Sequence, residues 1–358
     1  MQTVAEAIAE QLFFAGITTV FGLPGGENLP LLDAIRRQGI DFVLVRNESS
    51  AVYMADVTAR LTRTLGVVLT TLGPGATNAY AGIAHAYLDR SPVLLITAET
   101  SSTTVDYHTH QVLDLQAVFR PVTLFSKGVT SQNVHTLLRE TMLTMTEGRR
   151  GPVHLSLAKD VALTSAVHEP QEILTVEATS PKYQRFDGVS RLLKQSKRPL
   201  VIVGLGLEPE QPYDELEHFA RVANAPVIDT PKSKGALPSD HPLWVGTIGL
   251  APKDAAYQIL EEADCIIAVG FDAVELVKPW DSQKPLIWIA PWENNAPKIK
   301  ASYEFVGSIA PFLDNLSRNV PTPNVEWGVK RVRRFQETLA QQSISAAADE
   351  MRVLPHTV

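Results

Sequence analysis

The chain has 358 residues, 45% hydrophobic and 20% charged, with a net charge of -7 and a pI near 5.7. This acidic balance argues against nucleic acid or an anionic membrane as the main partner, and a single cysteine cannot build a disulfide framework or a cysteine-based metal site. The length predicts two or three domains. No apolar run reaches the ~18 residues of a membrane span, and the N-terminal helix carries acids, unlike a signal peptide. We therefore expect a cytoplasmic protein without nucleic-acid or membrane partners.

Strand and helix patterns alternate over residues 1–165, which predicts βαβ units around a mainly parallel sheet. One predicted strand, at 42–45, is apolar on both faces, as in a parallel strand that helices cover on both sides. Helices are expected up to residue 14, from residue 28 and after residue 78 to about 88, and strands over 18–21, 42–45, 66–71, 92–97 and 151–157.

A second alternating segment follows a polar, irregular stretch. Residues 166–185 are predicted to be an interdomain linker. Residues 186–320 are predicted to form a second, smaller α/β domain, and 321–358 to hold another linker with a charged helix near 327–351. The fold class that we predict is α/β, with two doubly wound, mainly parallel-sheet domains. The strands expected in the second domain are 199–203, 225–229, 265–269 and 285–289.

Three strand-to-helix turns of the first domain carry residues suited to a binding site. A glycine pair at 25–26 follows the first strand, Glu48 follows the second, and Gly-Pro-Gly at 73–75 follows the third. Because parallel strands end at one edge of the sheet, where open α/β folds bind ligands, the three turns are expected to meet. Each turn alone is also compatible with tight-turn chemistry, and Glu48 with a carboxylate that complements a helix dipole. The helix after Glu48 is expected to be capped by Ser49 or Ser50.

These turns resemble, in residues and order, the pyrimidine-binding domain of thiamine-diphosphate enzymes. The matching runs are Phe-Gly-Leu-Pro-Gly-Gly at 21–26, Arg-Asn-Glu-Ser-Ser-Ala-Val-Tyr-Met-Ala at 46–55 and Leu-Gly-Pro-Gly-Ala-Thr-Asn at 72–78. The most similar group is the acetolactate synthase and 2-oxoacid decarboxylase superfamily, whose central domain is resembled by Lys-Ser-Lys-Gly-Ala-Leu-Pro-Ser-Asp-His-Pro at 232–242. The resemblance covers nearly the whole chain and implies that the two predicted domains are the pyrimidine-binding and central domains of such an enzyme.

The resemblance also implies a chemistry. In that superfamily the glutamate matching Glu48 hydrogen-bonds N1′ of the cofactor's aminopyrimidine. This bond promotes deprotonation of C2 of the thiazolium ring. The deprotonated C2 atom then attacks the 2-keto carbon of a 2-oxoacid. A titratable group in a partly buried turn suits such proton transfer. The implied reaction is decarboxylation or carboligation of a 2-oxoacid such as pyruvate, with thiamine diphosphate and Mg²⁺, in a homodimer or homotetramer. The implied catalytic residues are Glu48, His110 and Gln111, and the implied cofactor-binding residues are Pro24, Gly25, Glu48, Thr71, Gly73, Pro74 and Asn78.

The sequence departs from the superfamily around these positions. Asn47 replaces the histidine common before the glutamate, so a proton relay through that histidine is not expected. In the run 107–114, Gln111 matches the Phe-Gln-Glu of acetolactate synthases, whereas His110 replaces the aromatic residue and Val112 the acid. The loop either contacts the substrate or is a polar segment that meets solvent. The glutamine match favours acetolactate synthase chemistry, while its neighbours leave a simple decarboxylase or a carboligase with another acceptor open.

Two features of the superfamily are not found in the sequence. Acetolactate synthases often hold FAD with an Arg-Phe-Asp-Asp-Arg run, but the equivalent segment 270–275 has neither arginine, and we expect no FAD. The Gly-Asp-Gly run of the diphosphate-binding domain is also missing. We therefore predict no metal ligand within the chain, and we expect the Mg²⁺ ligands on a third domain of which 321–358 resembles the linker and the opening. Alone, the chain is expected to be inactive.

Two other interpretations stay open. The chain could be a non-catalytic binding or assembly subunit that completes an active site on a separate diphosphate-binding chain. It could also be a nucleotide-binding α/β protein, for which the turn at 204–206 would have to hold a phosphate although Glu208 and Glu210 follow it. His85 and His154 lie in periodic apolar segments and are predicted to be core or structural residues.

Overall fold

The computed structural model divides the chain into two compact units, Met1–Thr175 and Val176–Val358. The division falls inside the predicted linker, most of which lies outside the described residues; the predicted domain bounds stay predictions. Among the described residues, no helix combines the length and the apolar character needed to cross a bilayer. The structure describes residues 1–104, 106–107, 110–167, 186–208, 210–278, 280–318, 320 and 323–349, with side chains for all of them except 186 and 343–349.

The first unit is built from short apolar strands that alternate with helices. Its first helix begins at a reciprocal cap, in which Glu6 N–H donates to Thr3 Oγ1 (3.2 Å) and Thr3 N–H donates to the Glu6 carboxylate (2.9 Å). The strands are β1 Thr19–Gly22, β2 Asp41–Leu44, β3 Gly66–Thr70, β4 Val93–Glu99, β5 Ser126–Gly128 and β6 Val153–Ala158. The helices are α1 Val4–Phe14, α2 Leu29–Arg37, α3 Glu48–Thr62, α4 Gly73–Asn78, α5 Tyr80–Leu88, α6 Leu115–Phe119, α7 Val134–Thr146 and α8 Lys159–Leu163.

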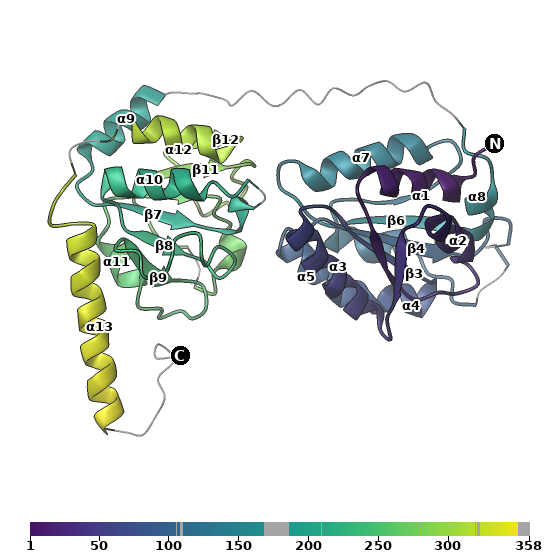
Figure 1. Cartoon of the computed structure of the whole chain (residues 1–358), viewed down its shortest axis with the longest axis horizontal. Coiled ribbons are helices and arrows are strands. Elements are labelled where there is room, and N and C mark those ends of the chain that lie inside the picture. The colour runs from purple at the N-terminus through teal and green to yellow at the C-terminus, as the bar shows by residue number, and fades with distance from the viewer. Residues whose placement is uncertain are drawn as a thin grey trace. The chain divides into compact units, whose positions relative to one another are not determined.

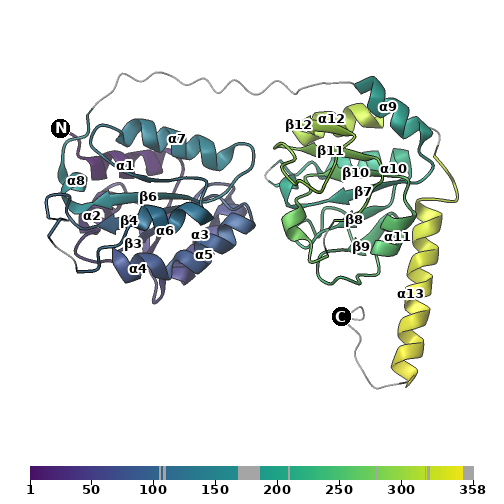
Figure 2. The same ribbon diagram turned by 180° about the vertical axis from the view of Figure 1, so that it is seen from behind.

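The described strands of this unit form one six-stranded parallel sheet in the order β2-β1-β3-β4-β6-β5. Helices α1, α2, α7 and α8 contribute to the apolar cluster on one face and α3 to α6 to the cluster on the other, as Figure 1 and Figure 2 show from the two sides. From β1 the chain passes to β2 on one side and then to β3 on the other. The topological switch point, where such sheets bind ligands, therefore lies between β1 and β3.

The second unit repeats this architecture with a six-stranded parallel sheet of order β12-β11-β10-β7-β8-β9 among the described residues. The fold class predicted from the sequence is confirmed. Trp327, Val332 and Phe335 are buried in one of its two apolar clusters, so the first turns of α13 pack on this unit. The strands are β7 Pro199–Val203, β8 Val227–Asp229, β9 Trp244–Thr247, β10 Cys265–Val269, β11 Leu286–Ala290 and β12 Tyr303–Val306. The helices are α9 Phe186–Gln195, α10 Tyr213–Ala223, α11 Tyr257–Glu262, α12 Ile309–Ser317 and α13 Val329–Asp349.

The position of β2 corrects one prediction. The strand was expected to be covered on both faces, but it lies at the edge of the sheet, and Leu44 at its end is 65% exposed. Phe42 and Val43 are only partly buried, one against each face of the sheet. Three strands were not predicted at all, namely β5, β9 and β12, and each of them is also an edge strand.

A buried histidine, His154 on β6, ties three strands together. Its Nε2 lies 2.9 Å from Thr97 Oγ1 on β4, and its Nδ1 lies 2.6 Å from Ser126 Oγ on β5. The Phe119 ring packs on it with a centroid distance of 4.6 Å. The side chain is fully buried, which lowers the pKa of His154 from 6.5 to about 3. The prediction that His154 is a structural core residue is confirmed.

This histidine is expected to make the first unit sensitive to acid. Below pH 6.5 the unfolded chain binds a proton at His154 that the folded chain does not bind until about pH 3, so stability is lost as the pH falls through that window. Between pH 7 and pH 5 the wild-type free energy of unfolding should fall by about 2 kcal/mol more than that of a His154→Gln variant. Urea unfolding at both pH values measures the difference. Equal losses in the two proteins would contradict the assignment.

Candidate functional site

The turn after β2 holds a buried carboxylate at the start of a long helix. Asn47, not Ser49 or Ser50, is the N-cap of α3, because Asn47 Oδ1 accepts the Ser49 N–H at 2.9 Å. This corrects the predicted cap and makes Glu48 the first helical residue. The helix dipole stabilises a carboxylate there, yet Glu48 is only 5% exposed. A charge complementing a helix terminus does not need such burial, so packing against other residues holds Glu48 in place.

Those residues come from the turn after β3. Asn78 Nδ2 donates to Glu48 Oε2 at 3.1 Å, and Ser49 Oγ donates to the Asn78 carbonyl. Gly75 faces the same carboxylate: a Cβ added to it would overlap Thr71 Oγ1 and lie 3.2 Å from Glu48 Oε1. Only a residue without a side chain fits here. The two predicted turns therefore meet around Glu48, as the parallel strands required.

The glycine turn after β1 joins this group through Thr71. A Cβ on Gly25 would overlap the Thr71 methyl group, so the two turns touch. Asn28, which is 3% exposed, fixes the turn by accepting the Gly25 N–H at 2.9 Å and donating to the Leu23 carbonyl at 2.9 Å. The sequence analysis did not single out Asn28, whose side chain bonds back to the preceding turn and does not cap α2. Pro24 is exposed beside the turn.

The loop before α6 reaches the other side of the β3 turn. Gln111 has a φ of 58° and Gly73 a φ of 54°, and a Cβ on Gly73 would lie 2.6 Å from the Gln111 carbonyl oxygen. The backbone of Gln111 therefore packs directly on this turn. His110 is exposed, and Pro74 is exposed at the start of α4. His108 and Thr109, which belong to the same predicted run, lie outside the described residues.

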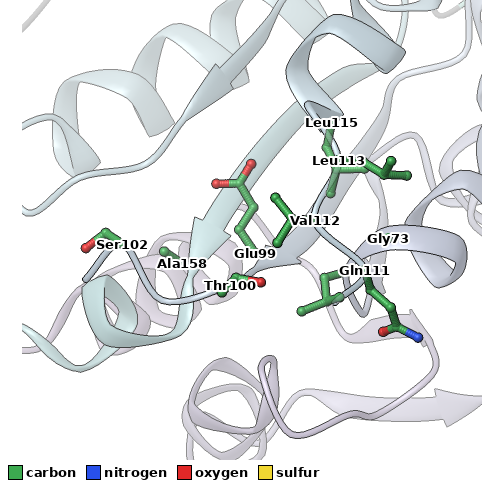
Figure 3. Close-up of a pocket in the computed structure, with 10 residues that line it drawn as sticks. Gly73, Glu99, Thr100, Ser102, Gln111, Val112, Leu113, Leu115 and Ala158 are labelled. Carbon is green, nitrogen blue, oxygen red and sulfur yellow. The ribbon is translucent and has the colours of Figure 1, made fainter. Parts of the chain in front are cut away.

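A cavity of about 230 Å³ opens between Gly73 and the ends of β4 and β6. Figure 3 shows the side chain of Glu99, the last residue of β4, beside Val112, while the amide end of Gln111 points away from Glu99. Burial raises the pKa of Glu99. The sequence analysis missed this residue. It ends an apolar strand at the ligand-binding edge of the sheet, and that position is the signal that could have found it.

An acidic cluster lies away from these turns and overturns the core alternative of the prediction that His85 is a core or structural residue. The His85 side chain is 43% exposed, not in the core, and its Nε2 lies 3.0 Å from Asp89 and 3.4 Å from Asp56. These three groups could surround a metal ion. However, Arg60 already pairs with Asp56 at 2.8 Å and with Asp89 at 3.0 Å, so the cluster holds a cation of its own.

In the second unit, the Gly204–Gly206 turn is engaged within the protein. Leu205 N–H donates to Glu275 at 2.9 Å, and Gly206 N–H donates to the Gly270 carbonyl at 2.7 Å. The Glu275 carboxyl also accepts from Thr230 Oγ1, and burial raises its pKa to about 7. A phosphate at this turn would meet a carboxyl group instead of free N–H donors, which disfavours the nucleotide-binding interpretation.

Comparison with protein families assigns both units of the chain to one family. Residues 2–118 match the family model described as "Thiamine pyrophosphate enzyme, N-terminal TPP binding domain", and residues 187–316 match "Thiamine pyrophosphate enzyme, central domain". The chain belongs to the thiamine pyrophosphate enzyme family. The first match includes Glu48, Asn78, Glu99 and Gln111, so the site described above lies within the family's N-terminal domain.

Curated relatives of this thiamine pyrophosphate enzyme chain are acetolactate synthase large subunits. The probable large subunit of Methanocaldococcus jannaschii is 32% identical over 275 residues, which are 74% of this chain and 46% of the relative. The isozyme 3 large subunit of Escherichia coli is 35% identical over 279 residues, which are 75% of this chain and 48% of the relative. The chain thus spans about half the length of the curated relatives it matches.

Two solved structures of thiamine-diphosphate-dependent proteins share the fold. The 4-hydroxybenzoylformate decarboxylase of Rhodococcus jostii has a TM-score of 0.78 at 21% identity, over 90% of this chain and 63% of that chain. A putative thiamin diphosphate-dependent enzyme from Mycobacterium smegmatis has a TM-score of 0.76 at 21% identity, over 90% of this chain and 64% of that chain. At this level of identity the likeness concerns the fold alone.

Proposed function

We propose that the chain acts in the thiamine-diphosphate-dependent decarboxylation or carboligation of a 2-oxoacid such as pyruvate, with chemistry like that of acetolactate synthase. The observation that carries the proposal is the Glu48 carboxylate, buried at a helix start and facing the side-chain-free surface of Gly75. An aminopyrimidine ring is flat, so it can lie close to a backbone that carries no side chain. Its ring nitrogen can then form a hydrogen bond with a nearby carboxyl group. The family membership and the acetolactate synthase relatives support the same reaction.

The residues around Glu48 fit the cofactor's aminopyrimidine. Glu48 would hold a proton at the ring nitrogen, and its hydrogen bond from Asn78 Nδ2 at 3.1 Å keeps the carboxyl group in one orientation. The turns at Gly25, Thr71 and Gly75 would hold the ring through backbone groups. Thiamine diphosphate, when bound, supplies the electron sink for breaking or making a carbon–carbon bond at the 2-oxoacid.

We place the diphosphate and Mg²⁺ on a diphosphate-binding domain, either further along the full-length chain or on a partner chain. His110 and Gln111 are proposed to contact the substrate beside the Gly73 turn. We keep the alternative that this chain completes a site on a separate catalytic chain. The reason is that the chain spans about half the length of its curated relatives. A cytoplasmic location stays a prediction.

A calorimetric titration with thiamine diphosphate and Mg²⁺, followed by a pyruvate assay, tests the proposal. It is run on this chain, on any longer product of its reading frame, and on this chain purified with its partners. Binding together with release of CO₂ from pyruvate in a longer or partnered form supports the proposed enzyme. If no form binds thiamine diphosphate, the proposal is wrong. If only a complex with a second chain turns over pyruvate, the subunit interpretation holds.

Helix α3 offers a surface for the proposed homo-oligomer. Tyr53, Val57 and Leu61, spaced four residues apart, are 43%, 54% and 80% exposed, and they form an apolar stripe on the helix that begins at Glu48. Leu88 at the end of the neighbouring α5 is 51% exposed. We propose that a second copy of the chain covers this stripe, which would place the partner next to Glu48.

Replacing Val57 by aspartate should weaken this self-association by at least about tenfold, because a charge would be buried in an apolar contact. Mass measured by light scattering across a dilution series reports the association constant. Val325, 75% exposed in the second unit, gives the matched control Val325→Asp, which should leave the constant unchanged. Equal behaviour of the two variants would remove α3 from the interface.

A further inference from the structure

The cavity beside the Gly73 turn is lined by other residues than those that surround Glu48. It has a volume of about 230 Å³ and lies at the carboxyl ends of β4 and β6. Gly73 and Gln111 form its border with the turn that carries Gly75 and Asn78. A ligand in the cavity would therefore sit next to the proposed aminopyrimidine site without occupying it.

Glu99 lines the cavity and is held by a chain of hydrogen bonds. Gln116 Nε2 donates to Ser156 Oγ at 3.3 Å, and the Ser156 hydroxyl is a hydrogen-bond partner of the Glu99 carboxyl. Because a carboxyl group has several hydrogen-bonding positions, the bond from Ser156 occupies one of them and leaves capacity for a ligand. The Glu99 carboxyl group is thus fixed at the end of a strand, where it can form a hydrogen bond with a ligand in the cavity.

Besides Glu99, the cavity is lined by three polar side chains, Thr100, Ser102 and Gln111, and otherwise by apolar residues and a glycine. Figure 3 shows Val112 beside Glu99 and Leu115 on the same side of the cavity, while the Leu113 side chain points away from Glu99. The Ser102 hydroxyl and N–H both donate to Asp160, the N–H at 2.9 Å, so Ser102 has no further proton to offer. Among the described residues that line the cavity, no side chain is basic. A carboxylate entering here would lose its water without meeting a cation among these described lining residues.

We propose that this cavity is a binding subsite for a small uncharged carbonyl or hydroxyl compound, and that Glu99 is the residue that selects such a compound against carboxylates. A carbonyl oxygen accepts a hydrogen bond from the carboxylic acid, and a hydroxyl group donates one to the carboxylate, so Glu99 recognises either. The apolar side holds the ligand's carbon atoms. Binding of the uncharged compound stands on the cavity alone, whereas its role as the acceptor in a carboligation rests on the proposed function.

Two small compounds of similar shape test the selection. Hydroxyacetone and pyruvate share an acetyl group and differ in carrying a hydroxymethyl or a carboxylate group. We expect hydroxyacetone to bind at least about tenfold more tightly than pyruvate, because the described lining gives a carboxylate no basic partner and places it beside the Glu99 carboxyl group. Ligand-observed NMR titration of the purified chain, without thiamine diphosphate, measures both dissociation constants. Tighter binding of pyruvate, or of the amine ethanolamine, than of hydroxyacetone would overturn the proposal.

Variants of Glu99 separate its role from general packing. Glu99→Gln keeps hydrogen-bonding capacity without charge, so hydroxyacetone should bind as in the wild type while the discrimination against pyruvate shrinks. Glu99→Leu should weaken hydroxyacetone by about tenfold through loss of the hydrogen bond, and Val112→Phe, which fills the cavity from the loop, should abolish binding of both compounds. The exposed Glu140 on α7, paired with Lys127, provides the control Glu140→Gln, which should change nothing.

Circular dichroism and thermal unfolding confirm that each variant is folded. Unchanged hydroxyacetone binding in Glu99→Leu and Val112→Phe would exclude this cavity as the binding site. A thiamine diphosphate titration on the longest available form distinguishes the two proposals. Binding of the cofactor without selective binding of hydroxyacetone would reject the subsite alone, and the reverse result would reject the proposed function alone.

Discussion

Glu48→Gln is expected to lower turnover of a 2-oxoacid by about 10²- to 10⁴-fold, the usual contribution of a positioned acid–base group. Glutamine keeps the shape of the side chain and can still accept the hydrogen bond that Asn78 Nδ2 donates at 3.1 Å. It cannot take up or release the proton that the aminopyrimidine nitrogen requires. The fold and the unfolding midpoint should stay close to wild type, because the substitution removes a charge at a helix start and little packing.

The measurement is the steady-state rate of pyruvate consumption by the assembled enzyme, whether a longer chain or a complex with a diphosphate-binding partner. Glu140→Gln is a matched control, since that carboxylate is 47% exposed and its pair with Lys127 is a surface contact. Near-normal turnover by Glu48→Gln, with thiamine diphosphate bound, would remove Glu48 from the mechanism and leave it a structural role at the start of α3.

The sequence predicted that the three turns meet, because their meeting depends on the parallel arrangement of the strands and not on individual side-chain contacts. Once residues 1–165 are interpreted as alternating strands and helices, the strand ends share one edge, and Gly25, Glu48 and Gly75 must come near one another. Motif spacing does not say which side chain touches which. The hydrogen bond from Asn78 to Glu48 and the overlap that excludes a Cβ at Gly75 required the three-dimensional structure.

What the sequence could not predict was the order of strands in the sheet. The apolar run 42–45 has the composition of a central strand, but β2 lies at an edge, where Leu44 is exposed. Conversely, β5 consists of Ser126, Lys127 and Gly128 and has no apolar pattern to detect. Edge strands tolerate polar residues and glycine because one side of the strand has no neighbour. A local pattern therefore identifies core strands better than edges.

Glu99 was missed and the exposure of His85 was not predicted, because the surroundings of both residues come from distant segments. Glu99 ends an apolar strand without a flanking glycine to mark it, and its cavity is lined by Val112 and Ala158 from elsewhere in the chain. His85 follows an apolar helical repeat, yet it points to Asp56 on α3 and Asp89 beyond the end of α5. Helical spacing indicates which residues share a face, but not whether that face meets the core or a charged cluster.

Gly75→Ala should reduce the affinity of the assembled enzyme for thiamine diphosphate by about 100-fold. A shift of the bound group by about one ångström has an effect of this size. The added methyl group would overlap Thr71 Oγ1 and come within 3.2 Å of Glu48 Oε1, so one of these side chains must move out of the site. Alanine favours the helix in which Gly75 lies, so a loss of affinity would not reflect a weaker α4.

Gly26→Ala is the control for Gly75→Ala. It tests whether replacing any glycine in the turns at this edge of the sheet lowers the affinity, or only one where the added methyl group crowds the site. No atom lies within 4 Å of a Cβ placed on Gly26, so this variant should bind thiamine diphosphate like the wild type. Isothermal titration of both variants, with melting curves of each, measures the contrast. If Gly75→Ala binds as tightly as Gly26→Ala, the ring does not approach the backbone of α4, and Glu48 would have to meet the cofactor from another side. If both variants lose affinity equally, the turns act through their flexibility instead of through the space at Gly75.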